Sequence, residues 1–375
     1  MTTITARRLL LDDAFLESAQ LVIEGQRILE VRQLKNAPSS FDVDILSPSY
    51  IDTHTHGGAG FDVMDEDEKA LREIALHKAR EGVGAFLATT STASLENTKK
   101  TLLRIAKYMK TQANDAATVL GTYLEGPYFT PQHKGAHEAS LFRELDLAEL
   151  DDLLEASDSS IKVLALAPEK QNSKEAIEYL RSRGVLVMLG HSAADYDCGC
   201  KALDAGANGL VHCYNAMNAL HHRSPGLLGA CLTDKRAFIE LIADALHVHP
   251  AMMKIAAKMA KERLLLITDS MRAAGMEDGE YEICGFAVWL KEGAVRLKSG
   301  NLAGSALRLD EAVKNMVNLV GLSQVEALNA ASSKPAHFLG LKDLGLLKAG
   351  YLANVLALDE GLNMKKLWIK GRRFF

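Results

Sequence analysis

The strongest constraint on the fold is a regular alternation in the middle of the chain. Short apolar runs of strand length alternate there with longer segments whose apolar residues recur at helical spacing, and several of these segments end in glycine, a common helix stop. Strands that alternate with helices form parallel βαβ units. Eight such units in roughly 230 residues match the size of a TIM-like (β/α)8 barrel, which is the α/β fold we predict. The runs are "PSYIDTHTH", "GVGAFLATTST", "ATVLGTYLEGPY", "IKVLALAPE", "VLVMLGHS", "NGLVHCYNAM", "RAFIELIADALHV" and "RLLLITDSM".

A doubly wound open sheet is the alternative fold that this pattern leaves. Such a sheet usually has fewer strands and a glycine-rich phosphate loop directly after its first strand. The glycines of "GGAG" follow the first apolar run, but they do not match that fingerprint. The barrel is therefore the favoured interpretation.

The two ends of the chain have a different character, because both consist of short strand-like runs. The segment "QLVIEGQRILEV" has two apolar runs around Gly25, which is a hairpin signal, and "LGLLKAGYLANVLALD" near the other end has the same strand-like character. We predict one small β-sandwich domain made of residues 1–48 and 340–375, with the barrel occupying residues 49–339. After the eighth run, a further hairpin is expected with its turn at Glu292 and Gly293.

Charge and composition narrow the class of protein. The net charge is −5, and no lysine or arginine cluster forms a footprint for a phosphate backbone, so we expect no nucleic-acid or anionic-membrane partner. The first residues lack the apolar stretch of a signal peptide, and no run reaches the length of a transmembrane helix. The five scattered cysteines are typical of reduced thiols rather than disulfides or a zinc knuckle. We expect a cytoplasmic protein.

Ionisable residues gather at the ends of the predicted strands, where barrel enzymes carry their chemistry. His54 and His56 are alternate residues of the first run, so they point to the same face. Four other runs also end in a histidine or a carboxylate. Taken singly, each of these residues is explained by a structural role, as a helix cap or a hydrogen-bond partner. Together they would be costly to bury unless a metal ion or mutual pairing offsets the cost. The residues on those four runs are Glu125, His191, His212 and Asp269. Nitrogen and oxygen ligands without cysteine suit Zn²⁺, Fe²⁺, Mn²⁺ or Co²⁺.

With these residues in place, the chain resembles the N-acetylglucosamine-6-phosphate deacetylases of the amidohydrolase superfamily. The resemblance runs nearly end to end and includes a likeness to the subgroup of N-acetylgalactosamine-6-phosphate deacetylases. It implies a (β/α)8 barrel with a small β domain from both ends, and a homodimer. The segments that carry it are "IDTHTHGG", "YLEGPYFTPQHKGAH", "LAPE", "LGHS", "HCYNAMNALHHRSPGLLGA", "IADALHVHP", "LITDSM", "LAGSAL" and "LGLLKAGYLANVLALD".

The resemblance implies a role for each strand-end residue. Glu125, His191 and His212 match the ligands of the main metal, zinc before iron, manganese or cobalt, and they leave a coordination position open for water. Asp269 matches a general base that takes the proton of that water and passes it to the amine. Some members keep a histidine pair like His54 and His56 and hold a second metal, and others work with one, so one or two metals per subunit remain open. Many other amidohydrolases use a carboxylated lysine as the bridge between metals, but Lys170 lies past its strand end and is not assigned that role.

The resemblance also implies contacts to the substrate, a small amino-sugar phosphate. His137 matches a histidine that polarises the scissile amide carbonyl. Asn215 and Ala216 match a loop that meets the phosphate, and His247 matches a contact to the sugar or phosphate. Arg223 matches a phosphate-binding arginine that reaches into the neighbouring subunit's active site, a role that suits its forked donors.

The implied reaction is metal-dependent hydrolysis of N-acetylglucosamine 6-phosphate to glucosamine 6-phosphate and acetate. The galactosamine isomer is the first alternative, because the two sugars differ at one hydroxyl. Glu138, Ala139 and Ser224 depart from the family pattern on loops expected to line the substrate, so they bear on this choice. A cyclic-amide or dipeptide amidohydrolase is the second alternative, and a barrel without catalysis is the third, although such a barrel would be expected to lose ligands.

Overall fold

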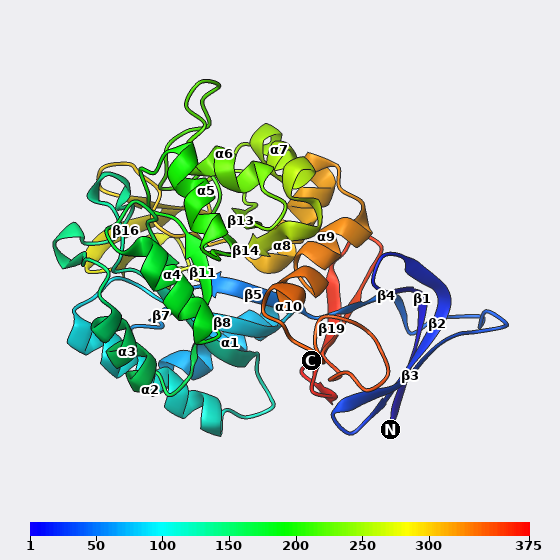
Figure 1. Cartoon of the computed structure of the whole chain (residues 1–375). Helices are drawn as coiled ribbons and strands as arrows, with labels where there is room; N and C mark the ends of the chain where they lie inside the picture. The colour runs from blue at the N-terminus through cyan, green and yellow to red at the C-terminus, as the bar shows by residue number, and fades with distance from the viewer.

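The centre of the molecule is a barrel of eight parallel strands. The computed structural model describes all 375 residues. The strands follow one another around the barrel in chain order, which confirms the predicted (β/α)8 topology (Figure 1). They are β5 (Tyr50–Thr55), β8 (Val83–Thr90), β9 (Thr118–Glu125), β10 (Ile161–Leu166), β11 (Leu186–Leu189), β12 (Gly209–Leu210), β13 (Phe238–Ile242) and β14 (Leu264–Ile267). Every residue of β8 is buried, as expected for a parallel strand that is covered on both faces.

A helix follows each barrel strand and covers the outside of the sheet. Strand and helix are paired as predicted because each helix has one apolar face to bury. In α2, Ser94 caps the first turn by accepting from the backbone N–H of Asn97, and Leu102 and Ile105 are buried against the barrel. The helices are α1 (Ala70–Arg80), α2 (Leu95–Thr111), α3 (Leu147–Ala156), α4 (Ser173–Ser182), α5 (Tyr196–Asp204), α6 (Gly226–Thr233), α7 (Pro250–Ala260) and α8 (Leu309–Asn315), with α9 (Gln324–Ala330) and α10 (Ser333–Phe338) after them. No helix combines the length and the apolar character that crossing a bilayer requires.

A small antiparallel sheet is inserted between β14 and α8. It contains β15 (Gly279–Ile283), β16 (Phe286–Lys291) and β17 (Ala294–Leu297). The predicted turn at Glu292 and Gly293 joins β16 to β17. A second two-residue turn, at Cys284 and Gly285, joins β15 to β16, and both of its residues have positive φ as a type I′ turn requires. This second turn brings the sheet over the barrel mouth.

The two chain ends form one small β domain beside the barrel, blue and red in Figure 1. Its seven strands are hydrogen-bonded in the order β20-β19-β18-β4-β1-β2-β3, so a strand from the C-terminal end pairs with β4 from the N-terminal end. A separate apolar core, with Leu9, Leu21 and Trp368 among its members, holds the domain together. The strands are β1 (Thr2–Leu10), β2 (Phe15–Glu24), β3 (Arg27–Gln33), β4 (Val43–Pro48), β18 (Val355–Leu358), β19 (Met364–Ile369) and β20 (Arg372–Arg373). A small β domain made of both chain ends is confirmed.

Candidate metal centre and active site

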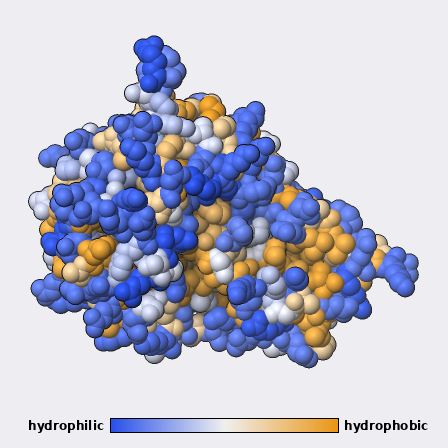
Figure 2. Space-filling view, viewed as in Figure 1, coloured by the Kyte–Doolittle hydropathy of each residue, from blue (hydrophilic) through white to orange (hydrophobic).

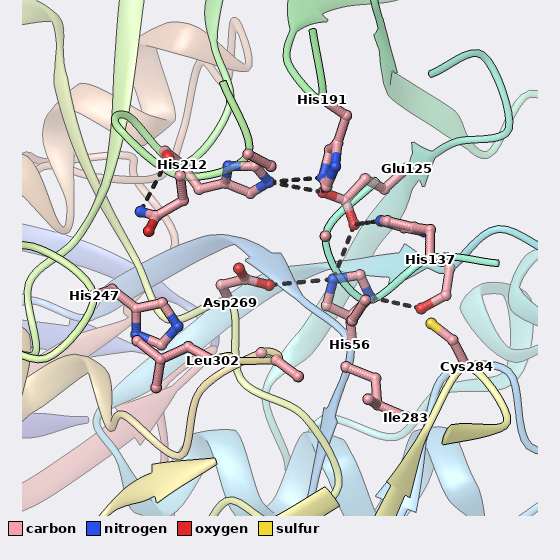
Figure 3. Close-up of a pocket in the computed structure, with 17 residues that line it drawn as sticks. His56, Glu125, His137, His191, His212, His247, Asp269, Ile283, Cys284 and Leu302 are labelled. Atoms are coloured by element: carbon pink, nitrogen blue, oxygen red, sulfur yellow. Dashed lines mark hydrogen bonds and ion pairs between the residues drawn. The ribbon is translucent and has the colours of Figure 1, made fainter. Parts of the chain in front are cut away.

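The predicted residues meet in one pocket at the carboxyl ends of the barrel strands. The pocket has a volume of about 250 Å³, and Figure 3 shows the side chains that surround it. His54 lies immediately beside it and is fully buried. The predicted residues that line the pocket are His56, Glu125, His137, His191, His212, Asn215, Ala216, His247 and Asp269.

Glu125 lies at the centre of this cluster, and its Oε1 atom faces three histidines. The Nε2 atoms of His54 and His191 each lie 3.4 Å from Glu125 Oε1, and that of His212 lies 3.3 Å away. The two histidine nitrogens His191 Nε2 and His212 Nε2 are only 3.0 Å apart. Zinc bonds of 2.0–2.1 Å in a tetrahedron place neighbouring ligand atoms about 3.3 Å apart. The three atoms of Glu125, His191 and His212 are therefore spaced like ligands around one metal ion.

The Oε2 atom of Glu125 faces the other side of the cluster. It lies 3.1 Å from His56 Nε2 and 3.4 Å from His137 Nε2. His54, His56 and Glu125 form a second group whose ligand atoms all lie within 4.8 Å of one another, so Glu125 is shared by two candidate metal positions. Lys170 instead pairs with Glu144 at 2.8 Å, away from the cluster.

Hydrogen bonds at the back of the rings orient two of the histidines. His191 Nδ1 lies 2.9 Å from the carbonyl oxygen of His133, which only accepts, so Nδ1–H donates and the lone pair of Nε2 faces Glu125. His54 Nδ1 lies 3.1 Å from the Oε2 atom of Glu240, a fully buried glutamate on β13. A carboxylate behind a histidine is the usual support of a metal ligand. Glu240 was missed in the sequence, although an acid inside the apolar run "AFIELIA" was a signal for it.

The donor set fits a divalent metal. His54 Nε2 and Glu125 Oε1 are buried and have no hydrogen-bond partner, although buried polar atoms are normally paired. A cation between the two groups of ligands would satisfy both atoms, and the ligands are nitrogen and oxygen only, which suits zinc and its neighbours.

Burial and charge shift the pKa values of the cluster in opposite directions. Burial lowers the pKa of His191 to about 4, so its imidazole is neutral at pH 7. Burial also tends to lower the pKa of His56, but Asp269 and Glu125 reverse this and raise it to about 9. Although burial favours the neutral acid, His56 and His54 lower the pKa of Asp269 to about 2. Asp269 is thus an ionised carboxylate, 3.2 Å from His56 Nε2.

Three residues of the cluster have an unusual backbone conformation directly after their strands. The φ angles are 48° for His191, 24° for His212 and 49° for Asp269. Positive φ is uncommon outside glycine and is often found at functional sites, where the surrounding structure maintains it. The turn that ends each strand therefore aims these side chains into the pocket.

Hydrogen bonds also orient His137 and His247, two further histidines that line the pocket. The backbone N–H of Thr92 donates to His137 Nδ1 at 3.3 Å, which leaves Nε2–H as a donor toward the pocket. His247 Nδ1 lies 2.6 Å from Asp244 Oδ2, so its other ring nitrogen is free. Asn215 and Ala216 also line the pocket, and their contact with the substrate phosphate stays a prediction.

Arg223 does not enter this pocket. It lies on an exposed loop, residues 218–224, which is the green loop standing out beside α6 in Figure 1. Figure 2 shows the tip of that loop as hydrophilic. The expectation that Arg223 serves a neighbouring subunit stays a prediction.

The small sheet contributes pocket residues that the sequence did not indicate. The turn between β15 and β16 brings Ile283 and Cys284 to the mouth, and the loop after β17 adds Leu302 and Gly304 (Figure 3). The hairpin was recognisable in the sequence, but its path over the barrel was not.

Comparisons of the sequence and of the structure with known proteins agree with one another. The sequence model of the amidohydrolase family matches residues 45–374. A protein of Escherichia coli O157:H7 named N-acetylgalactosamine-6-phosphate deacetylase is 52% identical over 98% of this chain and 97% of its own length. The N-acetylglucosamine-6-phosphate deacetylase of Vibrio furnissii is 46% identical over 88% of this chain and 83% of its own length. Among solved structures, the N-acetyl-D-glucosamine-6-phosphate deacetylase of Mycobacterium smegmatis superposes with a TM-score of 0.94 at 29% identity, covering 100% of both chains.

Proposed function

Because the chain belongs to the amidohydrolase family, we propose that it hydrolyses the N-acetyl group of an N-acetylhexosamine 6-phosphate, giving the amine and acetate. The observation that carries this proposal is the placement of Asp269, an ionised carboxylate at the pocket wall beside two candidate metal positions. Relatives at 52% and 46% identity bear the names of such deacetylases. The five unpaired cysteines support the expected cytoplasmic setting.

In this proposal Glu125, His191 and His212 hold a divalent metal, with zinc the first choice, and His54 and His56 offer a second position that shares Glu125. The chemistry that a metal supplies in such a site is activation of water and polarisation of a carbonyl. The ligand spacing and the two unpaired buried atoms support this assignment.

In this proposal Asp269 transfers a proton, and His137 stabilises the charge that develops on the carbonyl oxygen. Asp269 takes one proton from the attacking water as the new C–O bond forms at the amide carbon. His137 donates its Nε2–H toward the carbonyl oxygen, where negative charge develops. Asp269 then gives the proton to the amide nitrogen as the C–N bond breaks, so that acetate and the free amine leave. Asn215, Ala216 and His247 contact the sugar phosphate.

The sugar is the open choice within this function. We propose the glucosamine substrate as the main reading and the galactosamine substrate as the alternative, which the 52% identical relative favours. Turnover of N-acetylglucosamine 6-phosphate and N-acetylgalactosamine 6-phosphate by the purified protein decides between them. Activity on neither sugar, together with activity on an unphosphorylated cyclic amide or dipeptide, would contradict the proposal.

We propose further that the protein is a homodimer in which Arg223 contacts the substrate phosphate in the neighbouring subunit. The exposed position of Arg223, outside the pocket of its own chain, supports this. Arg223→Ala is expected to raise KM for the 6-phosphate about 10-fold or more, since charge-assisted hydrogen bonds contribute roughly 1.5–3 kcal/mol. Sedimentation should show a dimer in both proteins. A monomeric wild type, or an unchanged KM, would contradict this role.

A further inference from the structure

The barrel closes differently between β14 and β5 than between its other neighbouring strands. Every other pair is joined by a parallel ladder between named strands. Here the backbone pairing lies beyond the end of β14, where Asp269 N–H donates to His54 O at 2.9 Å and His56 N–H donates to Ser270 O at 2.8 Å. We call the contact between residues 52–57 and 268–270 the seam. It joins the histidine pair of one strand to the proposed general base of another.

A buried ammonium lies directly behind the seam. Lys78, on α1, has no solvent exposure. Its Nζ atom lies 2.9 Å from Ser270 Oγ, 3.2 Å from Thr268 Oγ1 and 3.2 Å from Asp52 Oδ2, and all three oxygens belong to the seam. A fourth partner is Glu81 Oε2 at 3.1 Å, on the residue that follows the last turn of the same helix. Burial tends to lower the pKa of Lys78, but Glu81 and Asp52 reverse this and raise it, so the charge persists.

The partners of Lys78 extend to the backbone that carries the site. Asp52 accepts from the backbone N–H groups of His54 and Thr268, both at 3.3 Å, and from the Thr268 hydroxyl at 2.6 Å. The Ser270 hydroxyl donates to Gly57 O at 2.9 Å. The three partners in the seam, Asp52, Thr268 and Ser270, therefore bind one of its sides to the other, and Lys78 contacts both sides.

We propose that Lys78 is a positioning residue, whose ammonium sets the spacing between the His54–His56 pair and Asp269. The proposal rests on the proposed function for the role of Asp269. Without the ammonium, the carboxylates of Asp52 and Glu81 would lose their shared cation in the interior, where an unpaired charge is very unfavourable. The strands would then separate at the seam and move Asp269 from its position 3.2 Å from His56 Nε2.

The test is Lys78→Met, measured by kcat and KM for the N-acetylhexosamine 6-phosphate and by hydrogen–deuterium exchange of residues 264–271. A displacement of about 1 Å at the reacting groups costs about 10²-fold in rate, so kcat should fall by about that factor. KM should stay within about 2-fold, because the sugar-phosphate contacts lie elsewhere in the pocket. The amide of Asp269 should exchange faster, whether or not the sugar is deacetylated.

A matched control separates positioning from general destabilisation. Lys334 on α10 is another buried lysine, and its Nζ atom donates to Lys261 O at 3.0 Å, outside the pocket and the seam. Lys334→Met should lower stability and leave kcat near the wild-type value. If Lys78→Met keeps wild-type kcat, or if Lys334→Met loses as much, the positioning role is wrong.

A second variant covers the case in which Lys78→Met does not fold. Ser270→Ala removes one hydroxyl from the seam and keeps both ion pairs of Lys78. It should lower kcat with little change in KM, in the same direction as the lysine variant, and a wild-type kcat would overturn the proposal. Absence of deacetylation by the wild type contradicts the proposed function instead, and the exchange measurement still tests the seam.

Discussion

The two halves of the candidate metal site share Glu125 but are held in different ways. His191 and His212 follow β11 and β12, which are neighbours in the continuous part of the sheet. His54 lies on β5 and His56 directly after it, at the seam, and both face Asp269 across it. The first half therefore follows two strands joined by a regular ladder, with turns of positive φ aiming its histidines into the pocket. The second half lies beside a strand contact that side chains bridge.

A histidine of one half and a histidine of the other also differ in their protonation at neutral pH. The imidazole of His191, with a pKa of about 4, is ready to bind a metal at neutral pH. His56, with a pKa of about 9, must release a proton before it can bind one. Within the first half, burial tends to lower the pKa of His212, but Glu125 reverses this and raises it, so the contrast lies between His191 and His56 rather than between two whole positions. The following predictions test that contrast.

The largest expected effect is the loss of catalysis without loss of metal. Asp269→Asn should reduce deacetylation by about 10²- to 10⁴-fold, because it removes the proposed proton carrier. Metal content, measured by elemental analysis, should stay at the wild-type level, since the first half is untouched. Near-normal turnover would show that another group carries the proton.

The shared ligand should matter more than a ligand of one half. Glu125→Gln should weaken metal binding by about 100-fold or more, because loss of an outer-shell partner alone costs 10- to 100-fold. His56→Gln serves as the comparison and should keep the metal of the first half. Equal metal loss in the two variants would mean that the pocket does not hold two metal positions that share only Glu125.

Replacing the carboxylate that supports His54 should have a smaller effect on metal binding. Glu240→Gln replaces the carboxylate behind His54 Nδ1 and should weaken metal binding in the second half by about 10- to 100-fold. Titration with metal should show one tight equivalent as before. Because Glu240 Oε2 also accepts from the backbone N–H of His212 at 3.4 Å, a first equivalent weakened as much as the second would show that Glu240 does not act mainly through His54.

The effect that is smallest per step is a gradual dependence on pH. Because His56 is protonated below its pKa of about 9, metal affinity in the second half should rise about tenfold per pH unit from pH 6 to 9 and then level off. Affinity in the first half should show no such contribution from His191, whose pKa is about 4. Equilibrium dialysis across this range measures both, and a flat second equivalent would refute the contrast.

The strand-end residues were predictable because barrel strands and their last residues follow a local pattern. Glu125, His191 and Asp269 each follow an apolar run, and parallel strands bring such positions together. Glu240 and Lys78 were not predicted, because their partners are distant in the chain. Glu240 contacts a residue 186 positions away, and the partners of Lys78 include one 192 positions away. In the sequence, Lys78 reads as one more charge on an amphipathic helix.

The pairing of β4 with β18 has a consequence for how the protein is made. Leu46 of β4 pairs with Ala357 of β18, so the sheet of the small domain cannot be completed until residues 355–358 have left the ribosome. The seam imposes a similar order on the barrel, since residues 52–57 must wait for residues 268–270. A chain shortened before β18 would leave the edge of β4 open to pairing with other chains, which favours aggregation. The synthesis of β18 is therefore the step that covers this edge of the sheet.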